Sequence, residues 1–519
     1  MLLELQSETL FDGLTTESLR RLFDGVLGVD VDPNACNAAS LSLSLLSLVL
    51  TDELPPQLQI IEADAIDYFE KHPELQGSMD AVVANPPFVN LEQQSPLLKQ
   101  RVAQLLGPHT QGRIDLYLAI LKIALDLLKP EGFGLFVLPE NFLKSKNAAG
   151  MRELLSEKSW IRCLVDLTAV RVFEDVGVYV ILLIFQKKSE YHEPSPSATV
   201  IRCQDLVGQA LESVLEDKST ESPFYTIFTN PQDAFFGSDW KIAPPRTALV
   251  LRKYTALSEL RDFAKVRLGM ITGLDDVFVV PAAEIERYDP ELFVPLLADR
   301  EMEAYRVPQT VKTAVFFPFQ EELPLTETIL REKFTKTWRY LSKNRSRLEA
   351  RTAVKNGQLP WWRPERPRQR RHLLRPKILT PHLVLAPRFA VDTGGRYAVS
   401  HSPYLVVEHC PNGSTEERDQ LFFLLGVLNS TPAFWYISQR AHVYERGYSR
   451  LEVATLSETR IPSYWSIDKT MRRRILHLVE ARLSASGEAA LRIEHDLDDV
   501  IGDTYGLSSQ EKIIVGVGG

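Results

Sequence analysis

The stretch Asp80-Ala-Val-Val-Ala-Asn-Pro-Pro-Phe88 decides the fold, because an apolar run ends abruptly in an Asn-Pro-Pro-aromatic turn. Residues 80–84 have the nearly unbroken apolar character of a strand that is buried on both faces. Pro86 and Pro87 fix their own φ angles and donate no backbone hydrogen bond, so the strand cannot continue through them. We therefore expect residues 85–88 to form a rigid turn at the carboxyl end of a buried strand.

Strands and helices alternate on both sides of this turn. The expected strands are Gly28–Val31, Leu58–Glu62, Asp80–Ala84, Phe133–Leu138, Ile161–Leu167 and Val178–Phe185, and the expected helices include Ala35–Leu50 and Asp115–Leu128. Such alternation predicts an α/β fold with a parallel, doubly wound sheet. Ligands of these sheets bind at the carboxyl ends of the strands.

The turn has the groups that a reaction at the exocyclic amine of a base requires. The lone pair of such an amine is delocalised into the ring, so the amine becomes nucleophilic only when acceptors bind its hydrogens. The side-chain oxygen of Asn85 and the backbone carbonyl of Pro86 are suitable acceptors. Phe88 offers a flat apolar face on which an extruded base can stack. A purely structural turn that ends a strand is the alternative.

These motifs, in this order, resemble those of the gamma-class adenine-specific DNA methyltransferases, the TaqI / Eco57I-like amino-methyltransferase family. Gly28-Val-Asp-Val-Asp-Pro33 is similar to the family's second motif, which implies that Asp30 binds the ribose hydroxyls of S-adenosylmethionine. Glu62-Ala-Asp-Ala65 implies that Asp64 binds the cofactor's adenine. Without the resemblance, each aspartate is an ordinary helix cap or turn former. The resemblance implies catalytic roles for Asn85, Pro86, Pro87 and Phe88, and a further cofactor contact at Pro87.

Later segments match the same family. The catalytic part includes Asp115-Leu-Tyr117, Leu128–Gly132 and Leu138–Phe142, and the target-recognition part includes Gly269–Gly273, Lys377–Pro381, Leu428–Ser430 and Arg446–Tyr448. Phe173 falls where the family places a second aromatic side chain against the target base, although a plain core position is an equal alternative. The resemblance thus extends over nearly the whole chain.

One family motif is missing from this sequence. Family members have a Gly-rich turn of the form D-P-x-x-G-x-G after strand one, and residues 1–27 contain only the isolated glycines Gly13 and Gly25. Met1–Leu5 is similar to the helix that follows that turn. Since strand one lies centrally in the family's sheet, between strands two and four, we expect an incomplete cofactor site. A second polypeptide that supplies the strand and the Gly-rich loop is a candidate partner.

The resemblance implies a domain organisation. We expect a Rossmann-like S-adenosylmethionine-dependent methyltransferase sheet, lacking its first strand, in residues 1–187. A connecting segment, residues 188–255, is expected to lead into an α+β target-recognition domain, residues 256–465. Residues 466–519 are expected to form a C-terminal helical segment.

Charge is distributed unevenly over the 519 residues, whose formal net charge is -9. Residues 1–150 contain 20 acidic and 10 basic residues, whereas residues 331–388 contain 17 basic and 3 acidic ones. The basic stretch follows Trp361-Trp362 and includes Arg363, Arg366, Arg368, Arg370, Arg371, Arg375 and Lys377. A solvated surface is the alternative, but next to a base-modifying domain we expect phosphate contacts with double-stranded DNA.

The composition excludes several protein classes. With 45% hydrophobic and 24% charged residues, the chain is neither disordered nor collagen-like. Its four cysteines are far apart, so we expect a reduced cytoplasmic protein, associated with the nucleoid, and no metal site. The apolar run Leu41–Leu50 is too short to cross a bilayer, and no signal peptide is evident.

These features predict a site-specific adenine methyltransferase of DNA within a restriction-modification or phage-defence system. One alternative is a methyltransferase for protein glutamine or RNA, since such enzymes also use Asn-Pro-Pro-aromatic turns. Another is a non-catalytic or split DNA-recognition subunit, which the missing Gly-rich turn favours. No motif indicates a nuclease.

Overall fold

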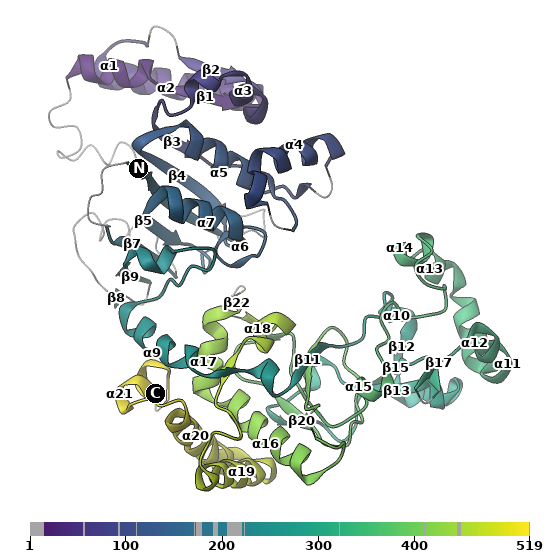
Figure 1. Cartoon of the computed structure of the whole chain (residues 1–519). Helices are drawn as coiled ribbons and strands as arrows, with labels where there is room; N and C mark the ends of the chain where they lie inside the picture. The colour runs from purple at the N-terminus through teal and green to yellow at the C-terminus, as the bar shows by residue number, and fades with distance from the viewer. Residues whose placement is uncertain are drawn as a thin grey trace. The chain divides into compact units, whose positions relative to one another are not determined.

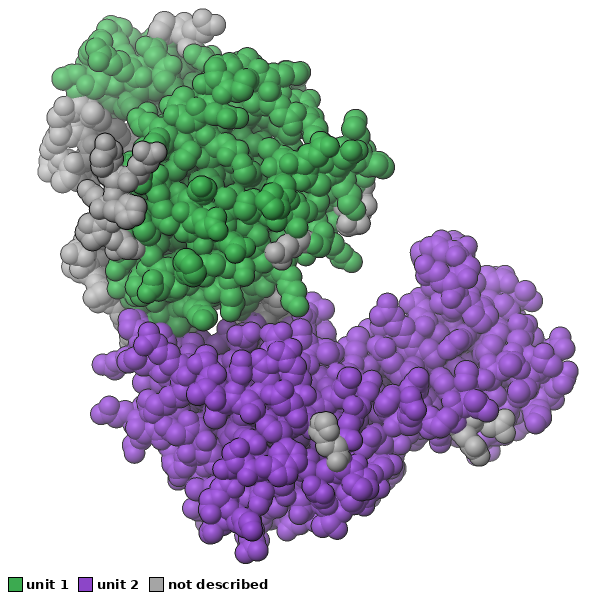
Figure 2. Space-filling view, in the orientation of Figure 1, with its two compact units in different colours: residues 1–244 green, residues 245–519 purple. Residues whose placement is uncertain are grey.

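The structure is a computed structural model that describes residues 15–55, 58–91, 94–110, 112–170, 172, 179–189, 196–204, 221–222, 224–320, 322–408, 410–443 and 448–517. The chain divides into two compact units, residues 1–244 and residues 245–519, and Figure 2 distinguishes them by colour. Each unit is a mixture of helices and strands, as Figure 1 shows. The prediction of a mixed α/β chain is confirmed at this level.

The larger sheet of the first unit has seven strands in the order β3-β4-β6-β5-β7-β9-β8. Their bounds are β3 Met79–Ala84, β4 Leu128–Pro139, β5 Ser159–Asp166, β6 Val180–Lys187, β7 Ala198–Cys203, β8 Glu221–Ser222 and β9 Tyr225–Asn230. β3 pairs parallel with β4, and β5 pairs parallel with β7. β6 runs antiparallel to both of its neighbours, β4 and β5.

The expectation of a wholly parallel sheet is therefore wrong for this part of the chain. A parallel crossover needs a dozen or more residues, usually folded as a helix, whereas antiparallel neighbours need only a short connection. The run of β-branched and apolar residues in β6 predicts a strand but does not encode its direction.

Two further strands form a sheet of their own. β1, Leu27–Asp30, pairs parallel with β2, Gln59–Glu62, so that Asp30 lies opposite Glu62. Three helices accompany them: α1 Thr16–Asp24, α2 Pro33–Thr51 and α3 Ala65–Lys71. Among the described residues, β3 is consequently an edge strand of the seven-stranded sheet and pairs with β4 alone.

Helices cover the seven-stranded sheet and enclose its core. They are α4 Pro96–Leu106, α5 Leu116–Leu127, α6 Asn141–Lys144 and α7 Ala149–Lys158. α5 begins after Asp115 and buries most of its side chains, among them Tyr117, Leu121 and Leu125. It packs with Phe136, Leu183 and Phe185 of the sheet in one apolar cluster.

The boundary between the units differs from the predicted one. β7 and β9 extend the sheet of the first unit, so residues that we expected to be a connecting segment belong partly to that sheet. Helix α9, Pro245–Thr255, belongs to the second unit, where the Tyr254 hydroxyl donates a hydrogen bond of 3.0 Å to the Pro432 carbonyl. The weak periodicity of residues 188–244 concealed these short strands.

The second unit combines several small sheets with helices. A five-stranded sheet has the order β11-β21-β18-β20-β14, and β12-β15-β13 form another. The strands are β10 Ser258–Glu259, β11 Lys265–Leu268, β12 Val279–Pro281, β13 Phe293–Leu296, β14 Tyr305–Arg306, β15 Thr313–Phe316, β16 Phe319–Gln320, β17 Leu323–Pro324, β18 Lys377–Leu379, β19 Leu383–Val384, β20 Ala390–Asp392, β21 Pro403–Val406, β22 His442–Val443, β23 Ser449–Arg450 and β24 Arg460–Ile461.

The helices of this unit contribute to several separate apolar clusters. They are α10 Asp275–Phe278, α11 Glu327–Lys333, α12 Thr335–Lys343, α13 Arg345–Glu349, α14 Thr352–Lys355, α15 Arg370–Leu373, α16 Thr415–Asn429, α17 Thr431–Arg440, α18 Val453–Ser457, α19 Lys469–Ser484, α20 Gly487–Thr504 and α21 Ser509–Ile514. Ile475 of α19 and Leu497 of α20 pack with Leu425 of α16 in one cluster. The C-terminal segment is helical as expected, and it is part of the second unit.

Helix α2 is long and apolar enough to cross a membrane, and the bent pair of α16 and α17 would qualify if taken as one span. Length and composition alone are weak grounds for a span. The α16–α17 pair carries buried core residues such as Phe423 and Ile437. In α2, Leu41 and Leu45 are exposed, whereas Cys36 is buried against β1.

Candidate functional site

The turn at residues 85–88 leaves the carboxyl end of β3 and is fastened to the start of α5. The backbone N–H of Leu91 donates to the Ile114 carbonyl at 3.0 Å, and that of Leu116 donates to the Val89 carbonyl at 2.9 Å. Pro86 is buried and Phe88 half-buried. Asn85 is exposed, and its side-chain amide has no hydrogen-bond partner among the described residues. The turn therefore presents a free amide from an anchored backbone.

Tyr117 of α5 lies directly behind the turn. Its ring meets that of Phe88 edge to face, with 6.3 Å between the centroids. Its side chain is buried, yet its hydroxyl has no partner among the described residues. Burial raises the pKa of Tyr117 far above its ordinary value, the Asp115 charge adds to this, and Arg152 opposes it. A buried hydroxyl without a partner is costly in a purely structural position.

Asp30 is the last residue of β1, and Asp64 follows β2 at the same end of their small sheet. The Ala63 N–H donates to the Asp30 carbonyl at 2.9 Å, which holds the two segments together. One carboxylate oxygen of Asp30 accepts from the Asp32 N–H at 2.8 Å, and one of Asp64 caps α3 by accepting from the Asp67 N–H at 3.0 Å. Both side chains are exposed, and their second oxygens bind no described residue.

These residues fit only one part of S-adenosylmethionine. Two exposed carboxylates with open oxygens suit the hydroxyl and amine donors of a nucleoside. Between β1 and β3, however, lies a groove of about 300 Å³ whose lining side chains, where present, are all apolar. Among the described residues, none of those lining this groove offers a polar side chain to the methionine part of the cofactor.

The first part of the basic stretch is open to solvent. Arg366 and Arg371 are exposed, and Arg363 and Arg370 are half-buried. The guanidinium of Arg370 lies 6.0 Å from the ring centroid of Phe317. Within the described part of the chain, no carboxylate forms an ion pair with any of these four arginines. They are therefore available to an external anion.

The other three basic residues are structural anchors. The Nε of Arg368 donates to the Gly269 carbonyl at 2.9 Å, and Arg375 pairs with the buried carboxylate of Glu417. Lys377 is fully buried, and its Nζ lies 2.8 Å from Asp392. Burial lowers the pKa of Lys377, and the Asp392 charge opposes that shift. The geometry does not support the expectation that these three side chains contact DNA, because each is already bound within the fold.

Arg351 fixes the course of the basic stretch, a role that sequence reasoning missed. Its buried guanidinium donates to the carbonyls of Thr272, Trp361 and Arg363 at 3.1, 2.7 and 3.0 Å. Trp361 and Trp362 are themselves buried, so they belong to the core. Arg351 differs from its basic neighbours because three carbonyls from separate segments meet at its guanidinium, and the sequence does not show this.

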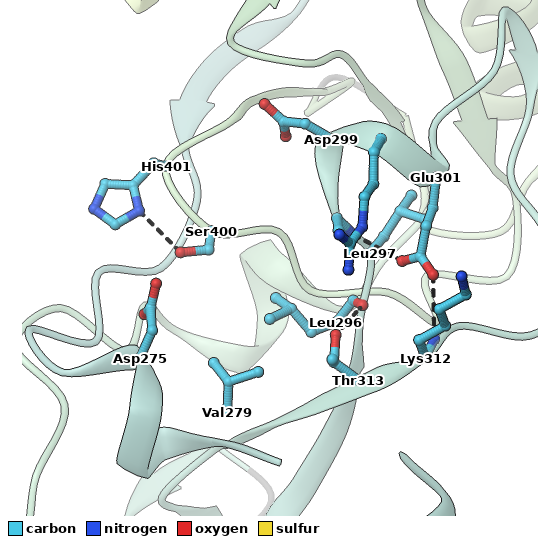
Figure 3. Close-up of a pocket in the computed structure, with 12 residues that line it drawn as sticks. Asp275, Val279, Leu296, Leu297, Asp299, Glu301, Lys312, Thr313, Ser400 and His401 are labelled. Carbon is cyan, nitrogen blue, oxygen red and sulfur yellow. Dashed lines mark hydrogen bonds between the residues drawn. The ribbon is translucent and has the colours of Figure 1, made fainter. Parts of the chain in front are cut away.

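A second cavity, of about 340 Å³, lies in the second unit (Figure 3). Its acidic residues are already engaged: Glu301 accepts from the backbone N–H groups of Lys312 and Ala298, both at 3.2 Å, and Asp299 accepts from that of His382 at 3.0 Å. The ammonium of Lys312 has no carboxylate partner among the described residues. The cavity therefore combines bound acids with two cations, Arg300 and Lys312, that pair with no described carboxylate, and no sequence motif indicated it.

Three comparisons relate the chain to known proteins. Residues 24–173 match the model of the Eco57I restriction-modification methylase family. The Type II methyltransferase M.BstVI of Geobacillus stearothermophilus is 23% identical, and the alignment covers 88% of this chain and 78% of M.BstVI. M.PaeR7I of Pseudomonas aeruginosa is 24% identical, with 86% of this chain and 73% of M.PaeR7I covered.

Two residues of the predicted motifs, Phe173 and Arg446, lie outside the described residues.

A solved structure extends the likeness over both units. The Type IIL restriction-modification enzyme MmeI, determined in complex with DNA, superposes with a TM-score of 0.63 at 12% identity. The match covers 95% of this chain and 65% of MmeI, so this chain spans slightly less than two thirds of that enzyme. At 12% identity, this likeness shows that the two proteins share a fold. Residues 24–173 are thus similar to the Eco57I restriction-modification methylase family.

Proposed function

We propose that this protein is a DNA methyltransferase that modifies the exocyclic amine of adenine within a restriction-modification system. The observation that carries the proposal is the Asn85-Pro-Pro-Phe88 turn, which presents an unbound amide from a backbone anchored to α5. The match of residues 24–173 to the Eco57I family model and the similarity to Type II methyltransferases support methylation, and the fold shared with DNA-bound MmeI supports DNA as the substrate.

S-adenosylmethionine is the proposed donor, and it supplies an electrophilic methyl group when bound. Asp30 and Asp64 would hold its nucleoside through their open carboxylate oxygens, next to Pro87. The Asn85 oxygen and the Pro86 carbonyl would accept hydrogen bonds from the amine as it becomes tetrahedral. Phe88, supported edge-on by Tyr117, would stack on the flipped base, and Phe173 remains the proposed second aromatic contact.

The second unit is the proposed target-recognition part. Arg363, Arg366, Arg370 and Arg371 would contact phosphates, since no described carboxylate pairs with them and none of the four is fully buried. Lys312 of the second cavity is a candidate for a further phosphate or base contact. These contacts position the duplex and supply affinity that does not depend on its sequence.

The test is Asn85→Ala, introduced at the gene's native locus, followed by sequencing that detects N6-methyladenine. We expect methylation at the protein's target sites to fall roughly a hundredfold or more, as for loss of a transition-state hydrogen bond. Gln94→Ala, an exposed amide beyond the turn, is the matched control and should leave methylation unchanged.

Near-normal methylation in the Asn85 variant would refute the catalytic role. Loss of a methyl mark from RNA or from protein glutamine, with no change in DNA, would assign the turn to a different substrate. Absence of any methyl mark in the unmodified strain would favour a non-catalytic DNA-recognition subunit.

A further inference from the structure

We propose that one face of helix α12 is a second contact surface for the phosphate backbone of duplex DNA, in addition to the arginines of the basic stretch. The face consists of Lys336, Arg339 and Lys343, and we call it the α12 face. The inference rests on the proposed function, because it adds a further part to the surface that receives the same DNA.

The three cations lie on one side of their helix. They are three and four residues apart, so in an α-helix they form a row over about 10 Å of its axis. All three side chains are exposed. The other side of the helix is packed, since Thr337 and Leu341 are at most 1% exposed. The core of this region therefore does not depend on the three charges.

The charges of the α12 face are not neutralised within the described part of the chain. Arg339 and Lys343 form no ion pair or hydrogen bond there, and the Lys336 ammonium donates to the uncharged Glu286 carbonyl at 3.2 Å. Residues 331–360 contain nine basic and only two acidic residues, and both acids pair with arginines outside the α12 face. Like charges four residues apart, such as Arg339 and Lys343, repel each other, and an external anion would relieve this repulsion.

Two contacts connect the α12 face to the start of the basic stretch. The ring of Trp338 in α12 lies 5.3 Å from that of Trp361, measured between centroids. Arg351, between α13 and α14, donates to the carbonyls of Trp361 and Arg363 at 2.7 and 3.0 Å. Figure 1 shows α12, α13 and α14 together at one end of the second unit. A single extended ligand can therefore contact both groups of cations.

The arrangement of the α12 face fits a ligand with regularly spaced anions. Duplex DNA carries about one charge per 1.7 Å of its axis, so several phosphates lie along a row of about 10 Å. None of the three residues lines either of the two cavities described above, which argues against a small enclosed anion. Exposed cations on a helix surface contact the backbone and carry no base preference of their own.

The test measures binding of the full chain to a labelled DNA duplex by fluorescence anisotropy at several salt concentrations. The triple variant Lys336→Gln, Arg339→Gln and Lys343→Gln should bind roughly tenfold to a hundredfold more weakly. Its slope of log affinity against log salt should flatten by about two to three units, about one for each lost contact. The charge-conserving variant Lys336→Arg, Arg339→Lys and Lys343→Arg should bind like the unmodified chain.

Unchanged affinity and salt slope in the glutamine variant would overturn the proposal. An equal loss after glutamine replaces the exposed Arg473, Arg474 and Arg492 would also overturn it, because that change removes the same charge elsewhere. So would a loss that is confined to single-stranded RNA.

The same measurement separates this proposal from the proposed function. If the triple variant of Arg366, Arg370 and Arg371 to Ala loses DNA affinity and the glutamine variant does not, only the α12 face is refuted. If the unmodified chain does not bind duplex DNA, both proposals fail.

Discussion

Strands β1–β3 and strands β4–β7 differ sharply in burial although both groups are rich in apolar residues. Phe136, Ile161, Leu183 and Val200 of the second group are at most 2% exposed, whereas no residue of the first group is buried. The candidate site residues Asp30, Asp64 and Asn85 lie at the carboxyl ends of these poorly buried strands. The described strands of this unit are thus well buried where they are remote from the site, and poorly buried where the site lies.

The basic stretch of the second unit shows the same contrast. Some of its positions are exposed and unpaired, which we call open, and others are buried in ion pairs, which we call closed. Arg366 and Arg371 are exposed without ion pairs to described carboxylates, whereas Lys377, a few residues further on, is fully buried on Asp392. Neighbours in sequence therefore have opposite roles. The position of each residue relative to the sheet formed by β18 and β20 decides its role.

The largest expected effect follows from substituting the buried lysine at the end of that stretch. Lys377→Ala leaves the Asp392 carboxylate buried without its partner, so the free energy of unfolding should fall by about 3–5 kcal/mol. Arg366→Ala should change it by less than about 0.5 kcal/mol. Urea denaturation of the two variants checks this, and equal losses would contradict the division into open and closed positions.

Substitutions of two valines test the difference in burial between the strands of the first unit. Val200→Ala in β7 removes fully buried methyl groups and should lower the free energy of unfolding by about 2–3 kcal/mol. Val83→Ala in β3 should lower it by less than about 0.5 kcal/mol, because that side chain is largely exposed. A large effect at Val83, measured in the same denaturation series, would show that β3 is packed as firmly as β7.

Removing open arginines should weaken DNA binding by about one to two orders of magnitude. In the triple variant of Arg366, Arg370 and Arg371 to Ala, we expect similar weakening for every DNA sequence. The slope of log affinity against log salt should flatten by about one unit for each lost phosphate contact. Replacing the exposed Arg473, Arg474 and Arg492 makes the same charge change elsewhere, and equal weakening there would indicate a general charge effect.

The smallest expected effect on stability concerns the hydroxyl behind the Asn85 turn. Tyr117→Phe removes a buried group without a described partner, so the free energy of unfolding should stay constant or rise by up to about 1 kcal/mol. If this hydroxyl serves the site, methylation should fall in the same variant. A clear loss of stability would instead reveal a partner that holds the hydroxyl in the folded protein.

The sequence predicts most elements of the first unit because its apolar runs are regular and its turns are marked by proline. β3, α2 and α5 lie within a few residues of the predicted ranges. The direction of β6 and the strands β7 and β9 were not predicted, since pairing partners are set by tertiary contacts. The same limit applies to Arg351 and Lys377, which resemble the solvated arginines in sequence and differ from them only in burial.

The motif order placed Asp30, Asp64 and Asn85 at strand ends, and the structure shows each side chain exposed there. The local hydrogen bond of Asp64 was also predictable, because an aspartate that follows a strand commonly caps the next helix. The sequence pattern alone does not show which polar groups a cofactor site here contains. That depends on a groove whose two walls are distant in sequence, Leu27–Val29 and Ala81–Ala84.

The central claim is that the described residues provide the nucleoside half of a cofactor site, in Asp30 and Asp64, beside a groove without polar side chains. Isothermal titration of the purified chain with S-adenosylmethionine tests it most directly. The account predicts no saturable binding, or a Kd weaker than about 1 mM, which corresponds to roughly 4 kcal/mol of binding free energy. Micromolar binding without any added polypeptide would show that the pocket is complete and would contradict the account.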